Sequence, residues 1–414
     1  MTEAVALAPV EARQRLHTLD VLRGFALLGI ALMNVEYFGR PLADVGSGVD
    51  PALRGVDYVL SWLIYVFVQG KFWILFSLLF GMGFALMATR THAAGGGFSK
   101  LYVRRSLGLL VIGLVHALAI WAGDILVTYA IGALLLLLFR DASPQKQGRL
   151  GALLYGAPVL GLLLMSVVML AMQAAGSSAG DDHAGSAHEA AEQAARAAEI
   201  AAYSTGSWWQ ATVVRAEYLL THIPEMLVFE CFALGIFLIG AWLLRSGAIA
   251  DPAAHALLYR RLRRFALPAG LVLALLSAAV TVQLDWKDDS AHAMLAMAVM
   301  LAAGPLLSLG YLALLVGAVQ TALGARVLGL LAPAGRMALS NYLLQSLVGT
   351  WLFYGYGLGL WGSVPRRWQV AGVVVGFALQ VLLSRVWLAY FRHGPAEWLW
   401  RAWTYRHFPA MRAR

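Results

Sequence analysis

LDVLRGFALLGIALMN occupies residues 19–34 and carries only three polar side chains in an otherwise apolar run. A helix that crosses a membrane needs about 20 predominantly apolar residues, because the hydrocarbon layer offers no partners to the backbone. Similar runs recur along all 414 residues, of which 60% are hydrophobic and 13% are charged. A soluble chain keeps roughly a quarter of its residues charged. The sequence therefore predicts an all-α, polytopic integral membrane helix bundle.

The apolar runs predict about ten transmembrane helices, at residues 20–39, 57–89, 104–122, 124–140, 149–173, 222–245, 264–283, 292–320, 336–360 and 367–391. The run at 57–89 is long enough to be one broken helix or two crossings, and Gln69-Gly70-Lys71 marks the expected break. Two crossings there would invert the orientation of every later helix.

Basic residues cluster in alternate loops. The clusters are Arg90, Lys100, Arg104 and Arg105; Arg140, Lys146 and Arg149; Arg245, Arg260, Arg261, Arg263 and Arg264; Arg326 and Arg336; and Arg392, Arg401, Arg406, Arg412 and Arg414. The alternate loops are acidic or neutral and contain Asp181, Asp182, Glu189, Glu192 and Glu199, and Asp285, Asp288 and Asp289. With ten crossings, only Arg366 and Arg367 lie on the wrong side for the positive-inside rule, so both termini are expected in the cytoplasm.

The chain reads as a single bundle over residues 1–414, with two five-helix halves at 1–173 and 222–391 and a basic cytoplasmic tail at 392–414. Residues 174–221 form the one sizeable external segment. Its Ala-rich part favours a helix, and Trp208-Trp209 resembles an interfacial anchor. We expect a short surface helix lying over the mouth of the bundle.

Several function classes find no support in the sequence. The net charge of +9 sits in short loops beside apolar runs, which indicates topology and no nucleic acid partner. Residues 1–14 lack the apolar core of a signal peptide, and the lone Cys231 cannot form an internal disulfide. There is no phosphate-binding loop, dinucleotide fingerprint, metal-binding cluster or Gly-x-Ser-x-Gly motif. Gly81 and Gly83 are expected to serve helix packing.

Polar residues inside apolar runs are candidates for function, because each is costly in hydrocarbon. Asp20 and Arg23 are three residues apart and can pair on one helical face, although a capped helix start with Arg23 at the headgroups explains them equally. Asn34 lies eleven residues beyond Arg23, about 16 Å along the same helix and near the same face. The capping alternative does not explain Asn34.

Four further sets of polar residues have either a functional or a structural role. His116 lies within the third apolar run, and Asp124 lies at the following turn. An imidazole in this setting can be a general base or an interhelical hydrogen-bonding group.

Glu230, two turns into the sixth run, is a candidate proton carrier, and Lys71 is either its counter-ion or an anion ligand. At the start of the ninth run Arg336, Ser340, Asn341 and Gln345 suggest an anion site on the inner side.

These stretches together resemble the YeiB-like family, which ends in the domain of unknown function 418. The resemblance rests on residues 19–30 (LDVLRGFALLGI), 71–83 (KFWILFSLLFGMG), 123–126 (GDIL) with Tyr129, 335–342 (GRMALSNY) and 394–401 (GPAEWLWR). They occur in this order over almost the whole chain. The family looks like a branch of the transmembrane acyltransferases, with the heparan-glucosaminide acetyltransferases and the membrane O-acyltransferases.

The resemblance implies a bacterial cytoplasmic (inner) membrane protein, a homodimer, that takes an acyl group from cytoplasmic acyl-CoA, first of all acetyl-CoA. The acceptor would be a hydroxyl or amine of a sugar, lipid-linked or small molecule on the far side. Arg23, Lys71 and Arg336, with Ser340 and Asn341, would then hold the coenzyme. Asn34 would stabilise the oxyanion, and His116 would be the base, oriented by Asp124 or Glu230. The O-acyltransferases have His at the position of Asn34, and the chain lacks the outer His of the other branch.

Two other functions remain open. A proton-coupled transporter or flippase of a small anionic or lipid-linked molecule would also use buried Lys, Glu and His, although no inverted repeat is evident. An inactive relative that binds a partner or lipid is the third possibility. The sequence specifies neither the acceptor nor the length of the acyl chain.

Overall fold

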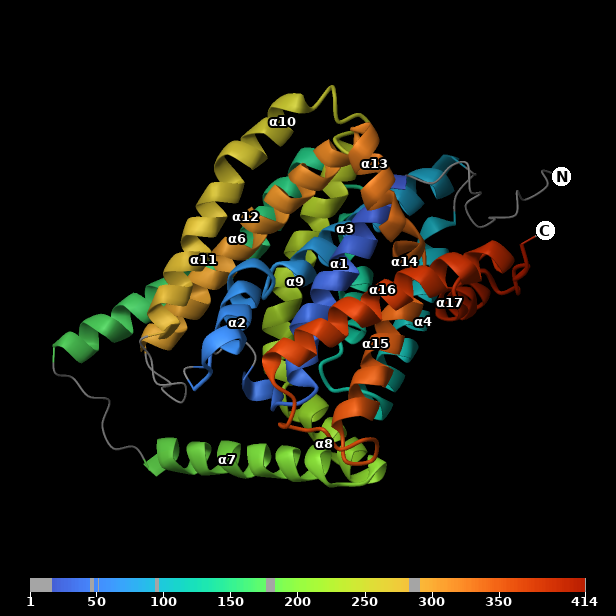
Figure 1. The fold of residues 1–414 in the computed structure, drawn as a ribbon. Helices are drawn as coiled ribbons and strands as arrows, with labels where there is room; N and C mark the ends of the chain where they lie inside the picture. Colours follow the sequence, from blue (N-terminus) through green and yellow to red (C-terminus); the bar gives the residue numbers. More distant parts are fainter. Residues whose placement is uncertain are drawn as a thin grey trace.

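The computed structural model describes residues 17–44, 48–50, 52–93, 97–175, 183–282 and 291–413, and these residues form helices and connecting loops without a β-strand (Figure 1). This confirms the predicted all-α class. The acidic residues Asp181, Asp182, Asp285, Asp288 and Asp289 and the segment 1–14 lie outside the described residues, so the predictions made for them are not addressed by the structure.

The helices are α1 (His17–Tyr37), α2 (Gly55–Phe67), α3 (Phe72–Ala93), α4 (Phe98–Ala119), α5 (Leu126–Leu136), α6 (Pro144–Ala174), α7 (His183–Ser204), α8 (Trp208–Thr221), α9 (Ile223–Arg245), α10 (Ala256–Arg261), α11 (Leu267–Val282), α12 (Ala291–Val319), α13 (Ala322–Leu328), α14 (Ala332–Arg336), α15 (Ala338–Phe353), α16 (Arg366–Tyr390) and α17 (Pro395–Tyr405). A π-helical turn (Leu262–Ala266) joins α10 to α11. Short 3₁₀ turns lie at Leu42–Asp44, Leu137–Phe139 and Gly329–Leu331.

Within the described residues, eight helices are long and apolar enough to cross a membrane, and a ninth span results if the bent pair Ala322–Arg336 and Ala338–Phe353 counts as one. The predicted fourth span corresponds to a shorter apolar helix, Leu126–Phe139. The chain is therefore a multi-pass membrane protein, and each of the ten predicted runs contains a helix. The predicted break at Gln69-Gly70-Lys71 is confirmed, because α2 ends at Phe67 and Gly70 has a φ of +79°. α2 and α3 together form one of the eight spans.

The centre of the bundle is formed by α1, α3 and α9, and small residues let these helices approach closely. A Cβ atom at Gly81 would lie 1.9 Å from the carbonyl oxygen of Phe237, and one at Gly240 would lie 2.1 Å from that of Leu78. Such contacts are typical of helix pairs in lipid, where packing drives association. The packing role expected for Gly81 is thus confirmed. The packing role expected for Gly83 is wrong, because a Cβ atom there would have Arg23 Nη2 as its nearest neighbour at 3.9 Å, and Gly83 lines a cavity. On the periphery, α6 and α16 expose Leu164 and Leu383, each 59% accessible, as lipid-facing residues do.

One end of the bundle, here called the α7 end, is covered by α7, which lies across it beside α8 (Figure 1). The predicted surface helix is therefore present and is longer than expected. The start of α8 carries a capping box between Ser207 and Gln210, and Trp208 and Trp209 are 45% and 65% exposed. This exposure suits an interfacial position.

The opposite end, here called the α17 end, gathers the basic loops. Arg245 donates a 2.6 Å hydrogen bond to the carbonyl oxygen of Ala142, and Arg140 bonds Ser99, so three predicted same-side loops touch one another. The predicted basic tail contains α17, which is attached to α4 because Trp400 and Trp403 donate to the backbone oxygens of Arg105 and Arg104.

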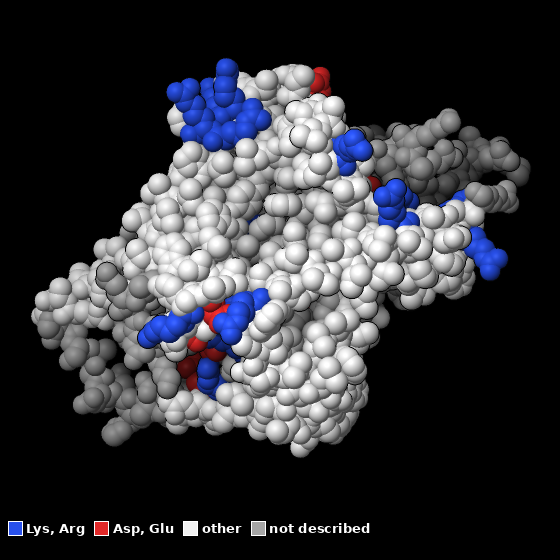
Figure 2. Space-filling view, in the orientation of Figure 1, with Lys and Arg blue, Asp and Glu red and all other residues white. Residues whose placement is uncertain are grey.

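Charge is distributed unevenly over the visible face of the molecule. Figure 2 shows a dense basic patch near α10, a wide uncharged belt, and a patch of mixed sign set into a hollow near α2 and the start of α16. The basic patch contains Arg260, Arg261, Arg263 and Arg264, all exposed. The uncharged belt between charged ends is the surface that a bilayer requires.

Candidate functional site

A buried histidine–aspartate pair lies where α4 turns into α5. The Nδ1 atom of His116 is 2.6 Å from Oδ2 of Asp124, and both side chains are buried. The other carboxylate oxygen, Oδ1, accepts the backbone N–H of Val127 at 2.7 Å and so caps the start of α5. His116 belongs to the last turn of α4, nearer the α7 end than the mid-membrane position expected from the sequence.

This pairing determines what His116 can do. A hydrogen bond from Nδ1–H to a carboxylate fixes the imidazole tautomer and leaves Nε2 as the free, basic nitrogen. Within the described part of the chain, Nε2 is buried and has no hydrogen-bond partner. The imidazole is thus oriented by Asp124 with one nitrogen available to a ligand or a reacting group.

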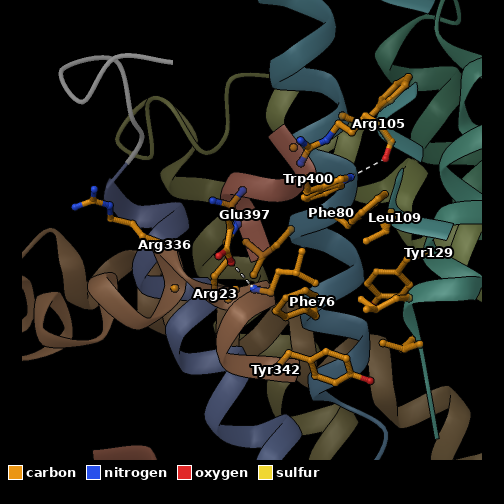
Figure 3. A pocket seen from close by; sticks show the side chains of 18 of the residues that line it. Arg23, Phe76, Phe80, Arg105, Leu109, Tyr129, Arg336, Tyr342, Glu397 and Trp400 are labelled. Carbon is orange, nitrogen blue, oxygen red and sulfur yellow. Dashed lines mark hydrogen bonds between the residues drawn. The ribbon is translucent and has the colours of Figure 1, made fainter. Parts of the chain in front are cut away.

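A cavity of about 220 Å³ has Trp400 and Arg401 of α17 in its lining and also Ile125, the residue that follows Asp124 (Figure 3). Figure 3 shows Arg105 and Trp400 at one side of the cavity and Tyr342 at the opposite side, with Phe76, Phe80, Leu109 and Tyr129 between them. The lining comes from α1, α3, α4, α5, α14, α15 and α17. Segments far apart in the sequence therefore build one site.

Four arginines from four helices line the cavity, namely Arg23, Arg105, Arg336 and Arg401, and among the described residues Glu397 supplies the only carboxylate of the lining. Arg23 forms the predicted pair with Asp20 at 3.0 Å, and Arg105 lies 3.6 Å over the ring of Trp400. The buried Nε of Arg336 has no hydrogen-bond partner among the described residues. A surplus of guanidinium groups is suited to an anion with several charges, such as a set of phosphates.

The single carboxylate of the lining is already engaged by the protein. Glu397 accepts the backbone N–H groups of Leu339 and Ser340 and the hydroxyl of Ser340, at 2.7, 3.1 and 2.5 Å. In return, Ser340 Oγ accepts the N–H of Ala396 at 3.0 Å, so the starts of α15 and α17 cap each other. Burial raises the pKa of Glu397, and burial together with Arg23 lowers the pKa of Arg401.

The wall of the cavity beyond the arginines is apolar, formed by Ile30, Phe76, Leu79, Phe80, Phe84, Leu109, Ile125 and Leu126. Tyr129 belongs to this wall, and its hydroxyl is held by the carbonyl oxygen of Trp73 and by Ser77 at 3.0 and 2.7 Å. At the far side, the ring of Tyr342 lies 5.1 Å from the imidazole of His116. The cavity thus runs from a cationic entrance along an apolar wall to the neighbourhood of the histidine–aspartate pair.

The structure brings together only part of the residue set suggested by the sequence. Arg23 and Arg336 share the cavity, and His116 pairs with Asp124. Lys71 lies elsewhere, fully buried, with Nζ 2.8 Å from the carbonyl oxygen of Tyr65 and 2.9 Å from Met300 Sδ. It therefore does not form the suggested pair with Glu230.

Four other residues suggested by the sequence lie in separate surroundings. Glu230 is buried beside Gly132, and its Oε1 has no hydrogen-bond partner in the described chain. Ser340 belongs to the α15–α17 junction described above. Asn341 donates to the carbonyl oxygen of Ala334 and to Ser384 at 3.2 and 2.9 Å. Asn34 is buried on α1, one turn beyond the cavity residue Ile30.

Four cavity residues, Arg105, Tyr129, Trp400 and Arg401, were not singled out as site residues from the sequence. Both arginines had been assigned to the basic clusters that set topology. The motif at residues 394–401 was part of the family resemblance but carried no proposed role. Its Glu397, Trp400 and Arg401 all line the cavity, so the motif itself was the signal.

Comparison with known proteins gives the family. The chain is 34% identical to the uncharacterized protein YxaH of Bacillus subtilis over 97% of this chain and 96% of the relative. The chain belongs to the YeiB-like family. It is also 32% identical to the uncharacterized protein YeiB of Escherichia coli, over 94% of this chain and 96% of that relative. An uncharacterized 39.9 kDa protein of Bacillus acidopullulyticus is 29% identical over 97% of the chain.

The family model described as "Protein of unknown function (DUF418)" matches residues 243–407. In this YeiB-like chain the match begins inside α9 and includes α17, whereas the C-terminal half expected from the sequence covers residues 222–391. It contains Arg336, Tyr342, Glu397 and Arg401, whereas Arg23, Arg105 and His116 precede it. The cavity is thus shared between the matched part and the helices before it.

Proposed function

We propose that this protein is a transmembrane acyltransferase that uses acyl-CoA, first of all acetyl-CoA, as donor. The hydroxyl or amine of the acceptor attacks the thioester carbonyl carbon, a C–O or C–N bond forms, and the C–S bond breaks. The acceptor proton passes to His116 Nε2 and then to the leaving thiolate. The products are the acylated acceptor and free CoA.

The observation that carries this proposal is the continuity of the site. One cavity has four arginines and an apolar wall in its lining, and the ring of Tyr342, which also lines it, contacts His116. Acyl-CoA has the same order of parts, from charged phosphates through a narrow arm to a thioester. The arginines would bind the phosphates by charge-assisted hydrogen bonds.

The oriented imidazole supports the chemical step. A base held by a carboxylate, with its second nitrogen free, is the arrangement used for proton transfer from hydroxyl groups. Asp124 fills the orienting role that the sequence left open between Asp124 and Glu230. Asn34 follows the cavity residue Ile30 by one helical turn, so it presents its amide on the same face of α1. We assign it the stabilisation of the oxyanion.

The orientation in the membrane follows from the same site. The α17 end carries the basic loops, and the positive-inside rule favours the cytoplasm for it. Cytoplasmic acyl-CoA would then enter at the arginines, and the acceptor would arrive from the α7 end. Because the similar proteins come from bacteria, we place the chain in the bacterial cytoplasmic (inner) membrane.

The first test is binding and transfer with the purified protein in detergent, using acetyl-CoA, longer acyl-CoAs and free CoA. We expect Arg336→Gln to weaken acetyl-CoA binding about tenfold, since a charged hydrogen bond contributes about 1.5–3 kcal/mol. His116→Asn should keep binding and lower transfer or acyl-CoA hydrolysis by about 10³. Arg260→Gln, at an exposed arginine remote from the cavity lining, is the matched control.

Full turnover of His116→Asn would remove the assignment of the base. Acyl-CoA that fails to bind at millimolar concentration would reject the transferase and favour the second candidate.

That candidate is a proton-coupled transporter or flippase of an anionic substrate, and the buried Glu230 favours it. Among the described residues its Oε1 has no hydrogen-bond partner, and it lies 2.4 Å from where a Cβ at Gly132 would stand. A carboxyl group without a partner inside a bundle is typical of proton carriers. In proteoliposomes, uptake driven by a pH gradient and abolished by Glu230→Gln would support transport over transfer.

A further inference from the structure

The layer at the α7 end contains a second aromatic cluster, separate from the cavity. The rings of Tyr203 and Tyr354 stack at 4.4 Å, and Trp361 lies 5.5 and 5.6 Å from them. Trp121 belongs to the same apolar cluster and lies 4.7 Å from Phe38. The cluster therefore joins α7, α8 and the loop after α15 to the turn that follows His116.

Arg215 of α8 lies inside this layer with none of its surface accessible. Its Nε donates to the carbonyl oxygen of Ala211 at 2.9 Å, within its own helix. Its two terminal nitrogens, Nη1 and Nη2, are buried and have no hydrogen-bond partner in the described residues. A buried guanidinium without an acceptor is strongly unfavourable, so a partner group is expected when the protein works.

The neighbouring acidic groups do not provide that partner. Glu199 Oε1 accepts the N–H of Leu42 at 3.1 Å, and Asp44 holds Arg196 through contacts of 2.5 and 3.1 Å. Burial raises the pKa of Tyr203, and the charge of Arg215 opposes this rise. The carboxylates of this layer are therefore committed to α7 and to the chain that follows α1.

Two further polar groups of the cluster also lack a partner among the described residues, namely Trp121 Nε1 and Tyr354 Oη. Both can donate a hydrogen bond, as Arg215 does. Trp121 connects the cluster to the reacting end of the site, because its backbone N–H donates to the carbonyl oxygen of His116 at 2.9 Å. Groups that can all donate call for a ligand rich in acceptor oxygens.

We propose that Arg215 binds an oxyanion of the acceptor substrate, a carboxylate or a phosphate monoester. The acceptor would thus be an acidic molecule that carries this group together with the hydroxyl or amine to be acylated. The planar guanidinium offers two parallel N–H donors to such a group. The role of the bound molecule as acyl acceptor rests on the proposed transferase function, whereas the binding of an oxyanion by Arg215 does not. Because Arg215 has no accessible surface, binding requires displacement of the side chains that cover it, and association should be slow.

The test is equilibrium binding to the purified protein without acyl-CoA, with glucuronate, glucose 6-phosphate and neutral glucose as probes. The wild type should bind at least one charged sugar ten or more times tighter than glucose. Arg215→Gln should abolish this preference while keeping acetyl-CoA binding, which shows that the cavity at the other end is intact. Arg260→Gln is the matched control and should keep the preference. A preference for one charged sugar identifies the oxyanion.

Equal or absent binding of charged and neutral sugars by the wild type would overturn the proposal, as would an unchanged preference in Arg215→Gln. Should Arg215→Gln not fold, Arg215→Lys keeps the charge without the forked geometry. Arg215→Lys must then weaken the binding of the charged sugar at least threefold, and an unchanged affinity overturns the proposal.

Failure of the proposed function gives a different result. Charged sugars would still bind through Arg215, while acyl-CoA would neither bind nor turn over. Conversely, acyl transfer to glucose and glucuronate at equal rates would keep the transferase and reject the role of Arg215.

Discussion

Arginines at the two ends of the bundle have opposite surroundings. At the α7 end, Arg366 contacts Glu36 at 2.7 Å, Arg196 contacts Asp44 at 2.5 Å, and Arg367 contacts Asp57 at 3.0 Å. At the α17 end, Arg105, Arg336 and Arg401 line the cavity without a carboxylate within salt-bridge distance among the described residues. Paired arginines hold helices together, and unpaired ones are left for a ligand. There are two exceptions, Arg23 at the α17 end, which lines the cavity and pairs with Asp20 at 3.0 Å, and Arg215 at the α7 end. The unpaired Arg215 therefore carries the proposal above.

The same comparison explains why Arg366 and Arg367 depart from the charge pattern of the loops. Each is paired with an acidic residue from another part of the chain, Glu36 or Asp57. The pairing gives both arginines a structural role at the α7 end. Because the positive-inside rule counts Lys and Arg and not net charge, they remain the exception to it.

The largest expected effect separates the two kinds of arginine by stability. Arg366→Met removes the more buried of the two arginines that pair with Glu36, while Arg40 remains, and should destabilise the protein by about 3 kcal/mol. The melting temperature in detergent should then fall by about 5 °C. Arg336→Met breaks no ion pair and should change the melting temperature by about 1 °C at most, while it weakens acyl-CoA binding.

A melting temperature lowered equally by both substitutions would contradict the comparison. It would show that the cavity arginines are as important to the fold as the paired ones. Lys71→Met provides a further check on ligand binding. Since Lys71 lies outside the cavity lining, acyl-CoA affinity should stay within about twofold of the wild type.

The sequence predicted the architecture because lipid imposes length and polarity on every spanning helix. The break at Gly70 was readable because a glycine and two polar residues interrupt an apolar run. The fourth helix was predicted too long because apolar residues alone do not show where α4 turns. That turn is set by Asp124, whose side chain caps α5.

The site was less predictable, because its parts meet only through tertiary packing. His116 and Asp124 lie eight residues apart, and the sequence suggested Asp124, as an alternative to Glu230, as the group that orients His116. Arg105 and Arg401 could not be recognised as site residues, because in a sequence a loop arginine that sets topology looks the same as one that lines a cavity. Lys71 shows the converse, since a buried charge in a family motif was suggested as an anion ligand and instead bonds the backbone of α2.

A smaller effect is expected from the single acid of the cavity lining. Glu397→Gln keeps an acceptor for the N–H groups of Leu339 and Ser340 but removes one negative charge. Acyl-CoA should therefore bind about fivefold tighter at low ionic strength, with the gain reduced by salt. Because burial raises the pKa of Glu397, the carboxyl group is more protonated at low pH, and the gain should be larger at pH 8 than at pH 6.

The matched control for this change is Asp141→Asn, whose carboxylate is 86% exposed and lies outside the cavity lining. It should leave acyl-CoA affinity unchanged at both pH values. Weaker binding in Glu397→Gln would mean that the carboxylate serves mainly to hold α17 in place. The cavity would then depend on the α15–α17 junction more than on its charge.

The smallest expected effect concerns the paired end. Burial raises the pKa of Glu199 from 4.5 to about 7, the nearby Asp44 adds to the rise, and the bond from Leu42 and the charge of Arg196 oppose it. Between these two pH values the folded protein holds a proton that the unfolded chain has released. The free energy of unfolding therefore decreases as the pH rises from about 4.5 to about 7, and this contribution is constant above that range.

Glu199→Gln keeps the acceptor for Leu42 and cannot ionise, so its melting temperature should fall less between pH 5 and pH 8 than that of the wild type. The difference between the wild-type and variant changes in melting temperature removes the contribution of the other titrating groups. We expect this difference, the remainder, to be about 2 °C. Glu217→Gln, an exposed acid on the neighbouring helix α8, should leave no remainder. A remainder of opposite sign would mean that Glu199 is stabilised in its ionised form. It would then act as a further partner of the arginines at the α7 end, and the pairing there would be more extensive than the contacts to Glu36, Asp44 and Asp57.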